Sequence, residues 1–282
     1  MSVLTDRFAR LRAEKRCGFI PFIVAGDPDL RATAALLLGL SELQPVAIEL
    51  GIPFSDPTAD GPVIQRASQR SLGNATTLTK IMRMLKGMRR APLAPIVLFT
   101  YYNPVLQLGV NGFTRAAARC GISGVLAVDL PAEAAEPLHT ELRRREIDLI
   151  QLIAPTTSDQ RLKQIARRAS GFLYVVSRTG VTGTAHELED ESRHTVQRVR
   201  QVSDLGIAVG FGITNRRQAR RVCEYADAAV VGSRLVAEIE AVTAKSDSGV
   251  SAVTDAVMRL ARQFTPTNGT ERRIAHLPYA DH

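Results

Sequence analysis

Short apolar segments rich in β-branched residues recur along the whole chain, and segments with helical periodicity separate them. A nearly continuous apolar run of this kind is typical of a strand buried on both faces, and burial on both faces indicates a parallel sheet. The runs are 19–25, 46–51, 95–100, 124–129, 148–154, 172–177, 207–211 and 228–232. The pattern therefore predicts eight parallel strands.

Helical periodicity lies between these strands, so strand and helix alternate. The expected helices are 32–43, 77–88, 110–120, 159–169 and 216–224. Two of them have start signals, because Asp159 and the pair Thr214-Asn215 stand where helix N-caps are favoured. The long connection from Gly51 to Pro95 has room for a loop and two helices.

This alternation predicts an α/β fold, a single (β/α)8 barrel of the TIM type, with an open doubly wound sheet as the alternative. We expect residues 1–264 to form one catalytic barrel domain. The tail 265–282 loses apolar periodicity and is expected to be mobile. Glu49, Asp129 and Ser177 stand at or just after strand ends, where a barrel forms a single mouth that carries active sites.

Composition and charge narrow the function classes. The chain has 282 residues, 45% of them apolar, which excludes a disordered chain. Its net charge of +8 comes from one segment, because no acidic residue stands between Asp60 and Asp129. The segment lacks the interleaved aromatic residues of a single-strand-binding surface. We predict no nucleic-acid partner. We expect the segment to form solvated helix faces. The alternative is a surface that binds a partner or steers a substrate.

Cysteine and histidine spacing indicates neither a metal site nor a disulfide. Cys17, Cys120 and Cys223 are widely separated and form no CxxC pair, which suits buried thiols in a reducing cytosol. The five histidines show no metal-ligand spacing. The apolar run 19–26 is too short for a membrane span or a signal peptide. We predict a cytoplasmic protein with no membrane partner.

Glu49 is the first candidate for chemistry. A carboxylate inside an apolar strand is costly to keep charged, so its pKa should rise toward the range that suits proton transfer near pH 7. The alternative is a strand-end glutamate that reaches solvent or an arginine. The loop 53–62 that follows contains three prolines and Gly61, and it brings a second carboxylate, Asp60, back toward the mouth.

Three glycine-bearing segments late in the chain suggest an anion site. They are 179–183, 210–212 and 232–233. Late strand ends of a barrel often bind phosphate through main-chain N–H groups and the N-terminus of a short helix, and glycine permits the close approach. Each segment alone is a weak signal, but three of them at consecutive strand ends indicate a phosphate site. Neither the dinucleotide-binding pattern nor a P-loop is present.

The motifs resemble those of the tryptophan synthase alpha subunit family. They are PFIVAGDPD at 21–29, ELGIPFSDPTADGPVIQ at 49–65, TYYNPV at 100–105, APTT at 154–157, SRTGVTG at 177–183, GFGI at 210–213 and VVGS at 230–233. The resemblance implies a (β/α)8 barrel and a carbon–carbon lyase of tryptophan biosynthesis. Its reaction would be the retro-aldol cleavage of indole-3-glycerol phosphate to indole and glyceraldehyde 3-phosphate.

The resemblance also implies residue roles. Glu49 would be the catalytic acid and base, and Asp60 the second carboxylate. Phosphate would be bound at Gly183, Gly212, Gly232 and Ser233. Tyr174 would line the pocket, and a loop at 178–190 with Thr182 would close over the substrate. Phe22 and Phe211 are expected to form an apolar slot for indole, whereas Phe99, Leu126 and Ile153 are equally consistent with barrel core.

The resemblance further implies a partner and no cofactor in this subunit. The partner would be a beta subunit with pyridoxal phosphate, joined in an alpha-beta-beta-alpha heterotetramer, and Asp56, Asn103 and Pro104 match the family's contact region. Two alternatives remain open. One is a stand-alone lyase that releases free indole, and the other is a basic barrel that binds an anionic macromolecule without catalysis.

Overall fold

The computed structural model describes residues 1–176, 185–210, 212–245 and 249–265. Within them, all the strand pairings are parallel. The strands are β1 Gly18–Val24, β2 Ile48–Gly51, β3 Ile96–Thr100, β4 Gly124–Ala127, β5 Asp148–Leu149, β6 Gln151–Ile153, β7 Phe172–Val176, β8 Gly206–Gly210 and β9 Ala228–Val231.

The sheet closes on itself through the fifth predicted segment. Its order is β5-β4-β3-β2-β1-β9-β8-β7-β6, so β5 and β6 are its two ends. These two strands are separated in sequence by Ile150 alone, whose N–H donates to the carbonyl of Val125 at 2.9 Å. One continuous segment thus pairs with β4 at its start and with β7 at its end. The prediction of a (β/α)8 barrel is confirmed, and the alternative of an open sheet is wrong.

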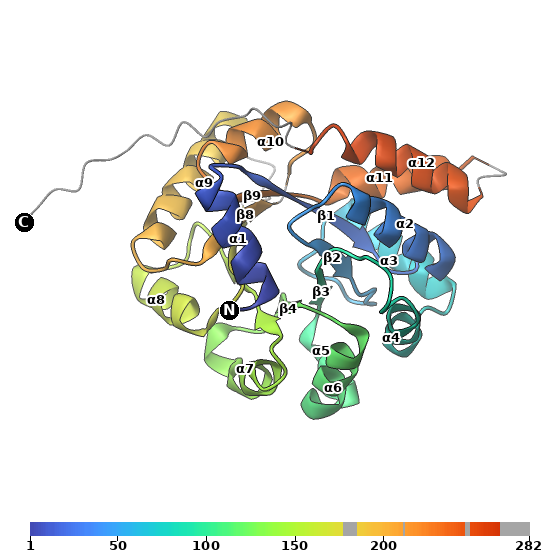
Figure 1. Ribbon diagram of the computed structural model, residues 1–282, viewed down its shortest axis with the longest axis horizontal. Coiled ribbons are helices and arrows are strands. Elements are labelled where there is room, and N and C mark those ends of the chain that lie inside the picture. The colour runs from blue at the N-terminus through green and yellow to red at the C-terminus, as the bar shows by residue number, and fades with distance from the viewer. Residues whose placement is uncertain (177–184, 211, 246–248, 266–282) are drawn as a thin grey trace, which may run out of the picture.

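Helices surround the strands as a ring (Figure 1). The five predicted helices are present with ends within two residues of the prediction, and the Gly51–Pro95 connection contains two helices as expected. Asn215 caps its helix as predicted, whereas Ser158, not Asp159, caps the helix that starts at Asp159. The helices are α1 Val3–Ala13, α2 Leu30–Glu42, α3 Pro62–Gly73, α4 Leu78–Gly87, α5 Tyr102–Leu108, α6 Val110–Cys120, α7 Glu136–Arg143, α8 Asp159–Arg168, α9 Ala185–Arg200, α10 Arg216–Cys223, α11 Ser233–Thr243 and α12 Val250–Ala261, with the 3-10 helix η1 Ala132–Ala134.

Two apolar layers follow from the alternation of side chains along each strand. In β1, Ile20 and Phe22 belong to the layer inside the barrel, whereas Phe19 and Ile23 pack in the layer between strands and helices. Helix α1 covers the amino ends of the strands, where the ring of Phe8 lies 5.1 Å from that of Phe172 (Figure 1). The opposite end of the barrel carries the candidate site.

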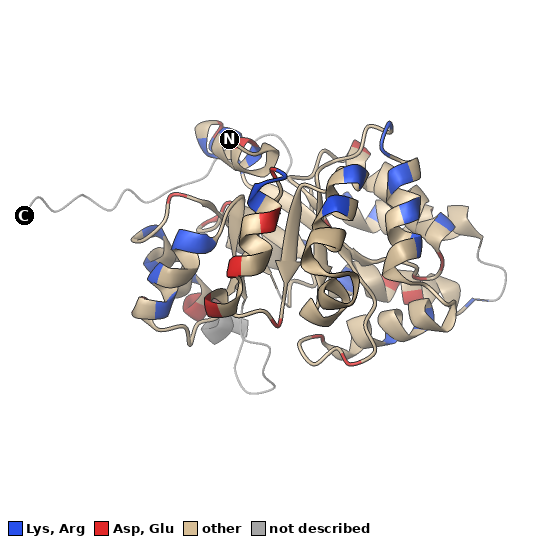
Figure 2. Cartoon of the chain, turned by 90° about the horizontal axis from the view of Figure 1, so that it is seen from below, with Lys and Arg blue, Asp and Glu red and all other residues tan. Residues whose placement is uncertain are grey.

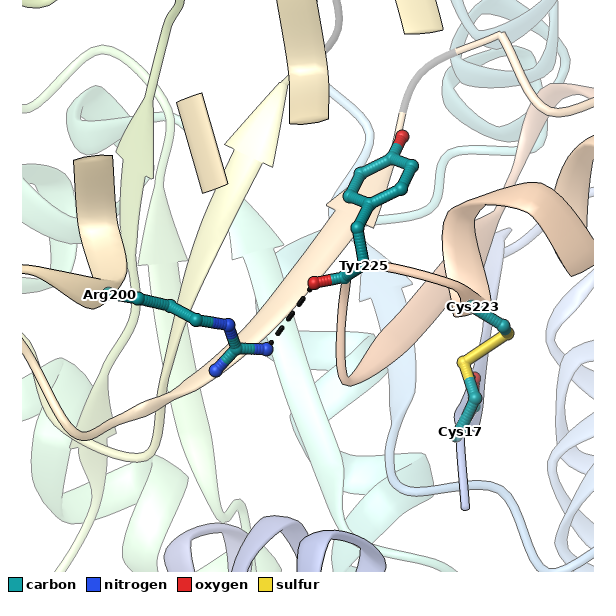
Figure 3. Close-up of a disulfide and its surroundings, with 5 residues drawn as sticks. Cys17, Arg200, Cys223 and Tyr225 are labelled. Carbon is teal, nitrogen blue, oxygen red and sulfur yellow. Dashed lines mark hydrogen bonds between the residues drawn. A yellow bond between two sulfur atoms is a disulfide. The ribbon is translucent and has the colours of Figure 1, made fainter. Parts of the chain in front are cut away.

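A disulfide joins Cys17, just before β1, to Cys223 at the end of α10, with Cα atoms 5.4 Å apart (Figure 3). Nearby, the Tyr225 carbonyl accepts a hydrogen bond from Arg200 at 3.4 Å. The prediction of free thiols at these two positions is wrong, because folding brings together residues that are 206 apart in sequence. Cys120 is a buried free thiol, as predicted. The cysteines therefore give no support for a reducing compartment.

The basic segment lies on the outside of the barrel. Arg66 and Arg70 form ion pairs with acidic residues from other parts of the chain. Its other cationic residues are exposed on α4, on α6 and in the connection after α4 (Figure 2): Lys80, Arg83, Lys86, Arg89, Arg90, Arg115 and Arg119. Because α4 ends before β3 begins and α6 before β4, several of these charges lie toward the amino ends of the strands. This placement favours solvated helix faces over a surface that steers substrate to the mouth.

The described residues contain neither a membrane-spanning helix nor a metal-binding cluster. No helix among them is long and apolar enough to cross a membrane. They also contain no group of three or more His, Cys, Asp or Glu side chains suited to a metal ion.

The disulfide should stabilise the barrel. Replacing Cys223 by Ser is expected to lower the free energy of unfolding by about 2–5 kcal/mol, because it releases a long closed loop in the unfolded chain. Thermal unfolding of the parent chain with and without a reductant should reproduce this loss, and the variant should not respond to reductant. Cys120→Ser is the control, since it should keep the reductant effect. Three free thiols in the unreduced, unfolded parent chain would contradict the cross-link.

Candidate active site

Glu49 lies in the middle of β2 and points into the barrel. Its register partners are Phe22 on β1 and Val97 on β3, and both belong to the interior apolar layer. The exposed fraction of Glu49 is 0%, and neither carboxyl oxygen has a hydrogen-bond partner among the described residues. Burial raises the pKa of Glu49 from about 4.5 to about 8, because the charged form loses its hydration. The carboxyl group is therefore mostly protonated at pH 7.

Aromatic rings line the space beside Glu49. The Phe22 ring meets the Phe99 ring edge-on at 5.2 Å, and both are buried. A side chain at Gly51 would lie 2.7 Å from Phe22, and one at Gly232 would lie 3.2 Å from it. The two glycines therefore make room for this ring between the strand of Glu49 and the end of β9.

Tyr174 is buried on β7 and lies close enough to Glu49 to interact with it electrostatically. Burial, followed by the nearby Glu49 carboxyl, raises the pKa of the Tyr174 phenol well above its usual value. A Cβ atom at Gly210 would lie only 2.1 Å from the Tyr174 hydroxyl. The neighbouring strand β8 must therefore carry glycine at this position if Tyr174 is to keep its place.

Asp60 closes the loop between β2 and α3, and Tyr101 fixes that loop. The Tyr101 hydroxyl accepts a hydrogen bond from the Ala59 N–H at 2.9 Å, and its ring stacks on Phe54 at 4.8 Å. Burial raises the pKa of Asp60 to about 6, an effect that a hydrogen bond from the Tyr101 hydroxyl opposes. No role was expected for Tyr101 from the sequence. Its place in TYYNPV, at the end of β3, was the signal that could have found it.

Part of the predicted phosphate site lies in the described residues. Gly212 follows β8 with φ +83°, and a Cβ there would meet nothing within 4 Å, so the backbone is open to close approach. Gly232 follows β9 and precedes Ser233, the first residue of α11, a helix without a side-chain cap. Such an N-terminus offers N–H groups to an anion. Gly183, Thr182 and Phe211 lie outside the described residues.

Of the two readings left open for Ile153 the structure favours core, and one other expectation about the surroundings is wrong. Ile153 belongs to the layer between strands and helices, because alternation in β6 turns Leu152 toward the barrel interior instead. The predicted loop at 178–190 is not all loop, because α9 begins at Ala185. Phe99 and Leu126 are both in the interior layer.

The predicted contact residues lie on the surface near the same end of the barrel. Asp56 is exposed in the loop after β2, and Asn103 and Pro104 are in α5, with Asn103 exposed. The same short helix exposes two leucines, Leu106 at 54% and Leu108 at 41%. Exposed large apolar side chains grouped on one element are typical of a surface that binds another protein.

Comparison with known proteins decides the family. The family model described as tryptophan synthase alpha chain matches residues 8–264. The chain belongs to the tryptophan synthase alpha chain family. Two relatives are the tryptophan synthase alpha chains of Trichormus variabilis, 47% identical over 256 residues (90% of this chain, 96% of the relative), and of Acidiphilium cryptum, 42% identical over 276 residues (98% and 100%).

Solved structures of tryptophan synthase agree with this family assignment and with the barrel fold. A chain of the α2β2 complex from Pyrococcus furiosus matches with a TM-score of 0.80 and 38% identity, over 88% of this chain and 97% of that one. The alpha subunit from Legionella pneumophila matches with a TM-score of 0.83 and 30% identity, over 94% and 98%. Tryptophan synthase alpha chains are lyases of tryptophan biosynthesis, and pyridoxal phosphate belongs to the beta subunit. The resemblance read from the sequence motifs is confirmed at the level of family, fold and enzyme class.

Replacing Gly210 by Ala should disturb the site. The added methyl would overlap the Tyr174 hydroxyl, so the tyrosine must move, and we expect a loss of about 1–3 kcal/mol in unfolding free energy together with reduced turnover. Thermal unfolding and steady-state kinetics measure the two effects. Gly87→Ala in α4, where a Cβ would meet nothing, is the control. If both alanine variants behave alike, the tight contact between β7 and β8 does not constrain the site.

Proposed function

We propose that this chain cleaves indole-3-glycerol phosphate by a retro-aldol reaction, giving indole and glyceraldehyde 3-phosphate. The observation that carries the proposal is the carboxyl group of Glu49, which is buried, lacks a hydrogen-bond partner among the described residues and has a pKa of about 8. A protonated carboxyl group inside an apolar pocket is a proton donor suited to carbon chemistry near neutral pH.

One such carboxyl group can both donate and accept the protons that the cleavage requires. Glu49 donates its proton to C3 of the indole ring, which leaves a cationic indolenine. The resulting carboxylate then removes the proton of the glycerol hydroxyl next to the bond that breaks. The electrons of the O–H bond form the aldehyde, and those of the C–C bond return to the ring, so neutral indole leaves. Glu49 ends protonated, and no cofactor takes part.

Asp60 has the complementary role in this proposal. Its pKa of about 6 lies below that of Glu49, so between about pH 6 and pH 8 Asp60 is mostly ionised while Glu49 is mostly protonated. An ionised Asp60 can accept a hydrogen bond from the indole N–H and stabilise the positive charge that develops on the ring. Environments that separate the pKa values of two carboxyl groups give them different roles.

The remaining site residues bind the substrate in this proposal. Gly183, Gly212, Gly232 and Ser233 would bind the phosphate through main-chain groups, and Phe22, Tyr174, Thr182 and Phe211 would line the pocket. The apolar walls formed by Phe22 and Phe99 support this assignment for the indole. The catalytic domain is proposed to span residues 1–264, and the tail 265–282 and a cytoplasmic location stay predictions.

Glu49→Gln tests the function directly. Because glutamine cannot donate a proton to carbon, we expect indole release to be abolished while substrate affinity stays within about tenfold, or roughly 1.4 kcal/mol. Indole release and equilibrium binding of the substrate are the two measurements. Glu42→Gln, an exposed position at the end of α2, is the control and should keep full turnover. Substantial turnover by the folded Glu49→Gln variant would show that Glu49 is not the acid and base.

The proposed partner is a tryptophan synthase beta subunit, in an alpha-beta-beta-alpha assembly. Similar structures such as that from Pyrococcus furiosus are α2β2 complexes. Asp56, Asn103 and Pro104 are proposed contacts, supported by the exposure of Leu106 and Leu108 on the helix that carries Asn103. Burying these leucines against a partner would remove apolar surface from water.

Adding a beta subunit distinguishes this assembly from a stand-alone lyase. We expect a large rise in indole-forming turnover on addition of the beta subunit, and a much weaker rise for Leu106→Asp. The matched control is Leu38→Asp, which changes an exposed leucine on a different helix, α2. Fast turnover by the isolated chain that does not change with the beta subunit would support the stand-alone reading and contradict the assembly.

A further inference from the structure

Four charged side chains form an ionic cluster (Asp27, Arg66, Arg70 and Glu240) that joins three elements of the barrel. Arg70 on α3 donates from Nε and Nη2 to the two oxygens of Asp27, each at 2.9 Å, and from Nη1 to Glu240 at 2.9 Å. Arg66, one turn earlier on α3, donates from Nε and Nη2 to the two oxygens of Glu240 at 2.7 and 2.8 Å. Glu240 lies on α11, and Asp27 lies in the connection after β1.

Each of the three elements also adjoins part of the candidate site. Helix α3 begins at Pro62, two residues after Asp60, and α11 begins at Ser233, directly after Gly232. Strand β1 carries Phe22. Glu240 is seven residues beyond Ser233, so at 1.5 Å per residue it lies about 10 Å along α11 from the N-terminus that would face phosphate. The ionic cluster is therefore placed to fix the site without touching the substrate.

The contacts within the ionic cluster divide into two separable links. Arg70 fixes α3 to the connection after β1, and this link is shared, because Ser71 donates to the Ala25 carbonyl at 2.6 Å and Asn74 to the Pro28 carbonyl at 2.6 Å. Glu240 supplies the ion pairs between α3 and α11, two helices that also pack against each other. A change at Glu240 therefore loosens one pair of helices while α3 keeps its contacts with the connection.

The geometry of these contacts favours orientation over simple stabilisation. Partly exposed ion pairs contribute little to stability, and the Glu240 side chain is 29% exposed. Paired N–H donors on a carboxylate, however, fix both the distance and the angle between the elements that carry them. An arrangement with Arg66 and Arg70 on the same carboxylate fixes the rotation of α11 as well as its distance from α3.

We propose that Glu240 is a positioning residue, which fixes the helix that would bind phosphate against the helix that follows Asp60. This inference rests on the proposed function. The substrate has its phosphate at one end and its indole at the other. The N-terminus of α11 can bind the phosphate while Asp60 contacts the indole only if α11 and α3 keep a fixed separation. Loosening the pair leaves phosphate binding intact and misplaces the indole end relative to Asp60 and Glu49.

The matched pair Glu240→Gln and Glu238→Gln tests the inference. Both residues are on α11, but among the described residues Glu238 pairs only with Arg234, four residues earlier on the same helix. For Glu240→Gln we expect kcat to fall about tenfold or more while KM changes less than about threefold, since small misplacements of reacting groups cost rate more than binding. Glu238→Gln should leave both constants unchanged. Binding of glycerol 3-phosphate, a probe of the phosphate end, should be unaltered in both.

The outcomes separate this inference from the proposed function. A parent chain that releases no indole from indole-3-glycerol phosphate, with or without a beta subunit, contradicts the proposed function. A parent chain that does so, together with Glu240→Gln at full kcat, contradicts only the positioning role. A fall in kcat that follows only a loss of folded protein, read from thermal unfolding, also contradicts it. Arg66→Lys, which keeps the charge and loses the paired donors on Glu240, should reproduce the loss of kcat.

Discussion

The candidate site depends on one carboxyl group that the fold buries completely and leaves without a hydrogen-bond partner among the described residues. Raising the pKa of Glu49 from about 4.5 to about 8 means that ionising it in the barrel costs about 5 kcal/mol more than in water. The folded chain tolerates this because the group stays protonated. The unfolded chain releases this proton near pH 4.5, whereas the folded chain holds it up to about pH 8. The free energy of unfolding therefore falls as the pH rises through this range. The fold therefore gives up stability above the usual glutamate pKa and keeps a protonated carboxyl group inside the apolar barrel interior.

The rest of the barrel mouth is arranged around this group. Glycines in the strands beside it leave room for the rings of Phe22 and Tyr174, which exclude water from the carboxyl group. Asp60, in contrast, is on a loop and has a hydrogen bond from Tyr101, so its pKa rises only to about 6. The two carboxyl groups of the candidate site thus differ in pKa because one is in a strand and the other follows it in a loop.

Sequence alone predicted the parts that depend on local pattern. Continuous apolar runs located the strands, and an acidic residue inside one of them marked Glu49. Contacts between residues far apart in sequence were not predicted, because spacing carries no information about them. The Cys17–Cys223 disulfide, the bond from Tyr101 to Asp60 and the ionic cluster of Asp27, Arg66, Arg70 and Glu240 are of this kind. The two readings of Ile153 stayed open for a different reason, since a run that is apolar throughout does not tell which side chains face inward.

Direct titration of the Glu49 side chain tests the central claim. Carbon-13 NMR of the side-chain carboxyl groups in glutamate-labelled protein follows each group with pH, and the Glu49→Gln variant identifies the signal of interest. We expect the Glu49 carboxyl to remain protonated at pH 7 and to titrate with an apparent pKa of about 8 in the substrate-free chain. A carboxyl group at this position that titrates near 4.5 would contradict the account, because Glu49 would then be ionised and unable to donate a proton at neutral pH.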